Sequence, residues 1–257
     1  MGGTQQRWTA RQVLHQLHGA QKKGEGVPAY TRWVNRWLAR YATAGAYRLG
    51  LGPNQVSLLS FTVSVVALTA LVLAPPHTHL AGVVVAVLLA LGFVLDSADG
   101  QLARLTGRSG PAGEWLDHVL DAVRSPAVHL CVLLVALTAT SSPVWLAATA
   151  FAFTLTQVGQ FSSQMLGGML LDRTDGPRTP ARRHQSWILL PTDTGVMCWV
   201  FVLWGWPTVF ATAYLVLLLL CLAFAGVSMR RRWRELRQVD ASRRASPAQQ
   251  VTVVEGA

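Results

Sequence analysis

Four aspartates stand in two closely spaced pairs near the middle of the chain. Asp96 and Asp99 are followed directly by Gly100, and Asp117 and Asp121 come after a short stretch that contains glycine. Residues three or four apart share one face of a helix, so each pair presents two carboxylates together, and four carboxylates in one place repel one another unless cations compensate them. Carboxylate oxygens are the ligands that Mg²⁺ and Mn²⁺ prefer, and two such ions form a common clamp for displacement at phosphorus. The pattern therefore indicates a site for one or two Mg²⁺ or Mn²⁺ ions and a phosphate ester.

Small residues and one arginine accompany the carboxylates. Gly100, Ala103 and Gly113 leave room for a ligand to approach the backbone. Arg104 follows Gly100 by four positions, on the same helix face, where its guanidinium can bind a phosphate through two parallel hydrogen bonds. Taken singly, a pair of intramembrane aspartates is as often a proton relay or a structural pair, and a glycine is usually a packing contact. The joint spacing favours a pocket for metals and a pyrophosphate.

Long apolar segments surround this motif. Hydrophobic residues make up 51% of the 257 residues and charged residues only 13%, whereas a soluble domain has about 25% charged residues. Six segments reach the length of a membrane-spanning helix, although Asp193 interrupts the fifth: 55–74, 80–103, 114–139, 143–166, 187–205 and 208–228. The sequence predicts an all-α polytopic membrane protein with six transmembrane helices rather than a large soluble bundle.

Basic residues follow the order of these segments. They cluster before the first span, between the second and third, between the fourth and fifth, and after the sixth, while the loops at 75–79, 140–143 and 205–207 contain no Lys or Arg. Basic loops mark the cytoplasmic side, so both termini and the carboxylates are expected there. The net charge of +10 then indicates attraction to anionic membrane lipids and not to nucleic acid. Richness in Ala, Val, Leu and Arg suggests a bacterial source, hence a bacterial cell membrane.

The first span is preceded by an amphipathic pattern. Trp33, Trp37 and Tyr41 recur at helical spacing on one stripe, and Arg32 and Arg36 lie on another. Such a helix lies in the cytoplasmic interface or packs on the bundle. We therefore divide the chain into a flexible segment (1–27), an amphipathic juxtamembrane helix (28–50), a six-helix domain (51–229) and a basic, then disordered, tail (230–257).

The carboxylate motif resembles that of the CDP-alcohol phosphatidyltransferase family (class I). The family motif is Asp-x2-Asp-Gly-x2-Ala-Arg-x8-Gly-x3-Asp-x3-Asp, and every defined position from Asp96 to Asp121 matches. The six spans, the preceding amphipathic helix and the residues that begin the first span extend the resemblance. Gly110 departs from it, because many members have Ser or Thr there.

The resemblance implies a reaction in which a phosphoalcohol group moves from a CDP-alcohol to a second alcohol and CMP is released. It implies that Asp96, Asp99 and Asp117 bind two metal ions and that Asp121 is both the general base and a ligand of one metal. Gly100 and Arg104 are implied to contact the nucleotide and pyrophosphate, and the segment that closes over the cytidine comprises Asn54, Gln55, Val56 and Ser57. Members of the family commonly form homodimers.

The expected donor is CDP-diacylglycerol, and the expected acceptor is a small polar alcohol such as inositol phosphate or glycerol phosphate. An alternative is a soluble CDP-alcohol donor with a lipid or polyol-phosphate acceptor. Two alternatives belong to other classes of protein, a transporter and a non-catalytic scaffold. A transporter that used the carboxylates as a relay would distribute them across the depth of the membrane, and a scaffold would not need intact carboxylates.

Four residues are candidates for binding the acceptor: Arg36, Arg182, Arg183 and Asp193. Asp193 has two interpretations, contact with the acceptor or an ion pair with Arg182 or Arg183. Arg124 is expected to pair with one of the motif aspartates.

Overall fold

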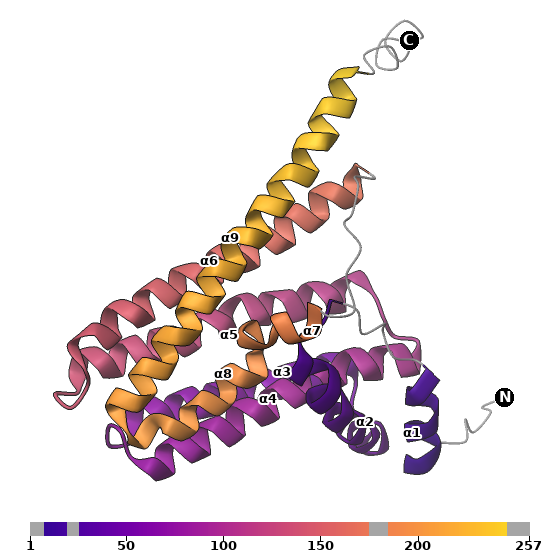
Figure 1. The fold of residues 1–257 in the computed structure, drawn as a ribbon. Helices are drawn as coiled ribbons and strands as arrows, with labels where there is room; N and C mark the ends of the chain where they lie inside the picture. The colour runs from indigo at the N-terminus through magenta and orange to yellow at the C-terminus, as the bar shows by residue number, and fades with distance from the viewer. Residues whose placement is uncertain (1–7, 20–25, 175–184, 246–257) are drawn as a thin grey trace, which may run out of the picture.

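The computed structural model describes residues 8–19, 26–174 and 185–245, and in these ranges it contains helices and no strand (Figure 1). Arg182, Arg183 and residues 246–257 lie outside the described residues. The principal elements are α1 (Ala10–Gly19), η1 (Thr31–Asn35), α2 (Arg36–Leu49), α3 (Pro53–Leu73), α4 (His79–Thr106), α5 (Pro111–Thr138), α6 (Val144–Arg173) and α9 (Pro207–Ala245). The all-α fold predicted from the sequence is confirmed.

Four helices among the described residues are long and apolar enough to cross a membrane: α3, α4, α5 and α9. The fourth predicted span forms α6, a helix of 30 residues that carries polar side chains from its middle onward, such as Gln157, Gln160 and Gln164. The chain thus has the helices of an integral membrane protein, but the count of six transmembrane helices is not confirmed.

The fifth predicted span is not one continuous helix. It consists of α7 (Gln185–Ile188), η2 (Leu190–Thr192), α8 (Thr194–Val200) and η3 (Phe201–Gly205). Pro191 lacks a backbone N–H, and the Asp193 carboxylate caps α8 by accepting a hydrogen bond from the Gly195 N–H at 3.0 Å. The apolar helical stretch Thr194–Gly205 is about 20 Å long, shorter than the roughly 30 Å of hydrocarbon that a straight span must cross.

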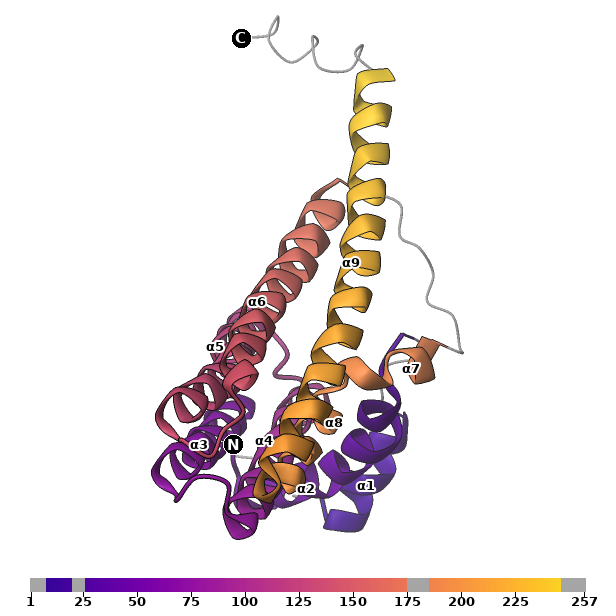
Figure 2. The same cartoon turned by 60° about the vertical axis from the view of Figure 1, so that its left-hand side comes forward.

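The three uncharged loops meet at one end of the bundle. The His77 ring contacts Ser142 Oγ at 2.8 Å and, at 3.3 Å, the carbonyl oxygen of Trp204, the residue directly before the third loop. The His79 and Trp206 rings lie 4.3 Å apart in the same region. The basic ends of α6 and α9 point away from this end (Figures 1 and 2). This segregation agrees with the alternation of charge along the sequence.

The amphipathic segment 28–50 packs on α4 through its small side chains. The Asn35 amide donates to Ser97 Oγ at 2.6 Å, and the Thr43 hydroxyl donates to the Ala98 carbonyl oxygen at 3.2 Å. The aromatic stripe of this segment is exposed, with Trp33 and Trp37 each 47% accessible. The arrangement suits a helix that rests on the bundle and turns its aromatic rings toward the membrane interface.

Two segments at the ends of the chain are more ordered than predicted. The helix α1 forms inside the segment that was expected to be flexible, because Val13 and Leu17 bury their side chains against Ala44 of α2. The basic stretch that follows the last span is not a separate tail but continues α9 to Ala245.

Candidate active site

The two aspartate pairs lie on helices that turn back at a short connection. Gly107 ends α4 in a left-handed conformation with φ of 65°, which a residue without a side chain adopts easily. Pro111 begins α5 after the extended Gly110, as prolines often do at the first helical position. Since α3 packs on both α4 and α5, the aspartates of the two helices face one another beside the first turns of α3.

Three of the four predicted metal ligands come together. Asp96, Asp99 and Asp117 each offer one carboxylate oxygen, and these oxygens lie within 4.8 Å of one another. Asp99 is 6% exposed, and the Ser57 hydroxyl donates to its Oδ2 at 2.5 Å. A cluster of three buried or half-buried carboxylates is a donor set that fits a hard divalent cation.

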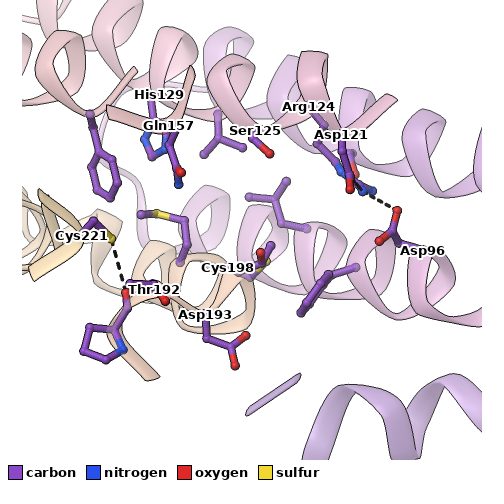
Figure 3. A pocket seen from close by; sticks show the side chains of 18 residues that line it. Asp96, Asp121, Arg124, Ser125, His129, Gln157, Thr192, Asp193, Cys198 and Cys221 are labelled. Carbon is purple, nitrogen blue, oxygen red and sulfur yellow. Dashed lines mark hydrogen bonds and ion pairs between the residues drawn. The ribbon is translucent and has the colours of Figure 1, made fainter. Parts of the chain in front are cut away.

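Asp121 lies beside this cluster and contacts Arg124. The Arg124 guanidinium donates hydrogen bonds to Asp121 and to Asp96, and it also reaches Ser60 Oγ at 2.8 Å. The expected pairing of Arg124 is confirmed, and it involves two aspartates rather than one. Arg124 therefore fixes the orientation of the Asp121 carboxylate relative to Asp96 (Figure 3).

A cavity of about 410 Å³ opens on the loop side of the aspartates, where the nucleotide was expected. Its lining includes most of the predicted donor-binding residues: Asn54, Ser57, Gly100, Ala103, Arg104 and Gly113. A side chain at Gly113 would lie 3.3 Å from Asn54 Oδ1, and one at Gly100 would lie 3.4 Å from Arg104 Nη1. Both glycines thus keep this cavity open, as their positions in the motif suggested.

Two residues of the predicted cytidine-closing segment do not line this cavity. Gln55 accepts a hydrogen bond from the Gly52 N–H at 2.7 Å and so caps α3, and Val56 is 1% exposed in the core between α2, α3 and α4. Successive residues on a helix point about 100° apart, so only some of the four can face one ligand. Arg108 and His118, which the sequence did not single out, line the cavity instead.

Arg36 belongs to a neighbouring cavity of about 290 Å³. This cavity is bordered by all three clustered aspartates and by Arg104. Burial, together with the positive charges of Arg104 and Arg32, lowers the pKa of the Arg36 guanidinium. Guanidinium groups gathered next to carboxylates suit a phosphate group that bridges between bound cations and arginines.

Asp193 is held within the protein. Its carboxylate is 2% exposed and accepts hydrogen bonds from the Thr31 N–H and hydroxyl, both at 2.8 Å, besides the one from Gly195. These contacts account for both of its oxygens without an acceptor molecule. The alternative pairing with Arg182 or Arg183 falls outside the described residues.

Carboxylates, arginines and glycines, grouped among apolar helices, define a membrane-embedded site for phosphate esters. The sequence profile of the CDP-alcohol phosphatidyltransferase family matches residues 51–227, more than half of the chain, and the chain belongs to this family. Members of the family are transferases that use divalent metal ions, and the aspartate cluster described above is able to hold such an ion.

Two archaeal relatives show similarity over a shorter region. The archaetidylinositol phosphate synthase of Aeropyrum pernix is 34% identical over 82 residues, which are 32% of this chain and 39% of the relative. The archaetidylinositol phosphate synthase of Pyrococcus horikoshii is 34% identical over 80 residues, which are 31% of this chain and 39% of the relative. The chain thus matches about two fifths of the length of either relative.

Proposed function

We propose that this protein transfers a phosphatidyl group from CDP-diacylglycerol to the hydroxyl of a small polar alcohol and releases CMP, in a reaction that requires Mg²⁺ or Mn²⁺. The observation that carries the proposal is the grouping of Asp96, Asp99 and Asp117 within 4.8 Å, with Asp121 beside them and a glycine-lined cavity next to them. The family membership supports the same reaction class.

The position of the site supports a lipid donor. The aspartates lie in the C-terminal half of α4 and the N-terminal half of α5, two helices apolar enough to cross a membrane. The acyl chains of CDP-diacylglycerol can therefore stay in the hydrocarbon while the CDP end enters the cavity lined by Gly100 and Arg104. Arg104 and Arg36 would bind the phosphates of the donor, because both border the cavity that contains the aspartate cluster.

The proposed roles of the residues follow from this arrangement. Divalent ions at Asp96, Asp99 and Asp117 would neutralise charge on the diphosphate. Asp121, oriented by Arg124, accepts the proton of the acceptor hydroxyl. The bond from the acceptor oxygen to the β-phosphorus forms as the bond from that phosphorus to the bridging oxygen breaks, and CMP leaves with the electron pair.

The acceptor is proposed at the level of a class. The two relatives are named as synthases of archaetidylinositol phosphate, which supports a polyol or polyol phosphate such as the inositol phosphate or glycerol phosphate expected from the sequence. Both phosphorylated and unphosphorylated polyols contain the hydroxyl that the transfer needs. The resemblance to the family also supports a homodimer. The charge pattern supports a location in the bacterial cell membrane with the site facing the cytoplasm.

The test measures CMP release from CDP-diacylglycerol by detergent-purified protein with Mg²⁺ or Mn²⁺ and a panel of alcohols. Asp121→Asn should lower kcat by about a hundredfold or more, because general-base catalysis contributes roughly that much. Asp240→Asn, an exposed position on α9, is the matched control and should keep full activity. Substantial turnover by Asp121→Asn would remove the base assignment, and turnover that survives a chelator would remove the metal requirement.

A further inference from the structure

A third cavity, of about 120 Å³, lies on the other side of the aspartates (Figure 3). It shares no lining residue with the loop-side cavity. On α4 and α5 the loop-side cavity uses residues toward the connection between the helices, whereas the third cavity uses Asp96 and Asp121 and then residues one to two turns deeper, such as Leu89 and His129. We call it the deep cavity, because it runs from the aspartates into the apolar interior of the bundle.

The direction of nucleophilic attack at phosphorus indicates which substrate binds in the deep cavity. In an in-line displacement at phosphorus, the incoming oxygen approaches opposite to the leaving group. If CMP leaves on the loop side, the acceptor approaches from the deep side, where Asp121 lines the cavity. This step rests on the proposed function.

The far end of the deep cavity provides no charge for a phosphate group. Among the described residues that line it, the only cation is Arg124, which already donates to Asp96, Asp121 and Ser60. Beyond Arg124 the lining is apolar, as at Phe153, or polar without Lys or Arg. The His129 ring in this lining contacts the Tyr214 hydroxyl at 2.5 Å, and the carboxylate of Asp193, one of the predicted acceptor residues, adds negative charge. An anionic group placed there without a cation would carry a large desolvation cost.

One side chain at that end is suited to bind a hydroxyl group. Gln157 of α6 lines the deep cavity, and its amide makes no hydrogen bond to another residue in the part of the chain that the structure describes. An amide that lines an apolar cavity with no partner in the protein is costly to bury, so a ligand with hydrogen-bonding groups can stabilise it. An amide offers both a donor and an acceptor, which matches the hydroxyl groups of a neutral polyol.

We propose that the deep cavity binds the acceptor, that this acceptor is an uncharged, unphosphorylated alcohol, and that Gln157 determines this specificity. The reacting hydroxyl lies at Asp121, and the remaining hydroxyl groups bind the Gln157 amide. The cationic groups near the aspartates then serve the diphosphate of the donor alone.

The test compares matched acceptors with CDP-diacylglycerol as the donor: glycerol against glycerol 3-phosphate, and inositol against inositol 1-phosphate. For at least one pair, the unphosphorylated member should give a kcat/KM at least about tenfold higher. Gln157→Leu should raise the KM for that acceptor by about tenfold and leave the KM for CDP-diacylglycerol unchanged. Gln16→Leu, an exposed position on α1, is the matched control, and the thermal midpoints of both variants report whether they fold.

The outcomes separate this proposal from the proposed function. Preference for the phosphorylated member of every productive pair overturns the uncharged acceptor while CMP release upholds the transferase. An unchanged acceptor KM in a folded Gln157→Leu variant overturns the role of Gln157. Absence of CMP release with any alcohol, in protein that binds CDP-diacylglycerol with Mn²⁺, overturns both proposals.

Discussion

The link between Thr31 and Asp193 joins parts of the chain that are 162 residues apart, and its loss should release the juxtamembrane helix. The Asp193 carboxylate is almost fully buried and accepts two hydrogen bonds from Thr31. Beside this link the Tyr30 ring lies so close to Gly195 that a side chain there would be 2.0 Å from it, and the Trp199 ring N–H donates to the Tyr30 hydroxyl at 2.9 Å. The link therefore orders η1, from which α2 continues.

Thr31→Val tests the link with a change of nearly constant shape. Valine keeps the backbone N–H bond to Asp193 and removes only the hydroxyl bond, which as a bond to a charged acceptor contributes about 1.5–3 kcal/mol. If the segment opens locally, the loss of this free energy makes opening easier. The protection of amides in residues 28–49 against hydrogen exchange should then fall by roughly ten- to a hundredfold. Because Arg36 lies on this segment and borders the aspartate cavity, the KM for the donor should rise as well.

The assay is amide hydrogen exchange with the activity measurement in parallel. Thr62→Val is the matched control, because Thr62 is exposed on α3 and its hydroxyl bonds only to the Leu58 carbonyl oxygen of its own helix, at 2.8 Å. Thr31→Ser should restore most of the protection, since it keeps the hydroxyl. Exchange in Thr31→Val equal to that in Thr62→Val would refute the reasoning, because the hydroxyl bond would then contribute nothing to the ordering of the segment.

Three further changes follow from the packing. Gly92→Ala would place a methyl group 2.5 Å from Ser64 Oγ and 3.2 Å from the Ser60 carbonyl oxygen, so the Ser64 hydroxyl must turn away and the α3 backbone must shift slightly from α4. We expect the free energy of unfolding to fall by about 1–3 kcal/mol, seen as a lower thermal midpoint, and an unchanged midpoint would contradict the close approach. Gly113→Ala narrows the loop-side cavity beside Asn54, so the KM for the donor should rise by several-fold with little change in thermal midpoint, and the reverse pattern would show that Gly113 serves packing alone. Burial lowers the pKa of His77, which is then neutral in the folded protein and protonated in the unfolded chain below its ordinary value of 6.5, so stability should fall as the pH drops below about 6.5. His77→Asn, which suits the φ of 55° at this position, should weaken that dependence, and an equal slope in the variant would show that another group is responsible.

Much of the fold was accessible because it depends on short-range patterns. The lengths of the apolar segments predicted α3, α4, α5 and α9, since a helix that crosses a membrane must be apolar over its whole span. The fifth predicted span is apolar like the others, but it does not form one continuous helix. Pro191 and Asp193 break its helix, and the carboxylate that looked like an interruption of a span is satisfied by Thr31.

Some features of the candidate site were likewise predictable from local spacing, and others were not. Helical periodicity put Asp96 and Asp99 on one face. The resemblance implied that the whole segment from Asn54 to Ser57 contacts the donor, but only Asn54 and Ser57 line the loop-side cavity, and Val56 lies in the core. The contact of Arg124 with two aspartates at once required the two helices to be placed relative to each other.

The sequence by itself indicated the reaction class, because every defined position of its motif matches that of the CDP-alcohol phosphatidyltransferase family. It also placed each pair of carboxylates on one helix face, because one turn of helix is the same in any fold. It also determined that these carboxylates lie among membrane-spanning helices. Only the tertiary structure decided what surrounds them. The deep cavity is formed by side chains from separate helices, among them Asp121 on α5 and Gln157 on α6, and the lack of a cation at its far end among the described residues is a property of their packing. Such a property has no signature in local spacing, because it depends on which faces of distant segments meet.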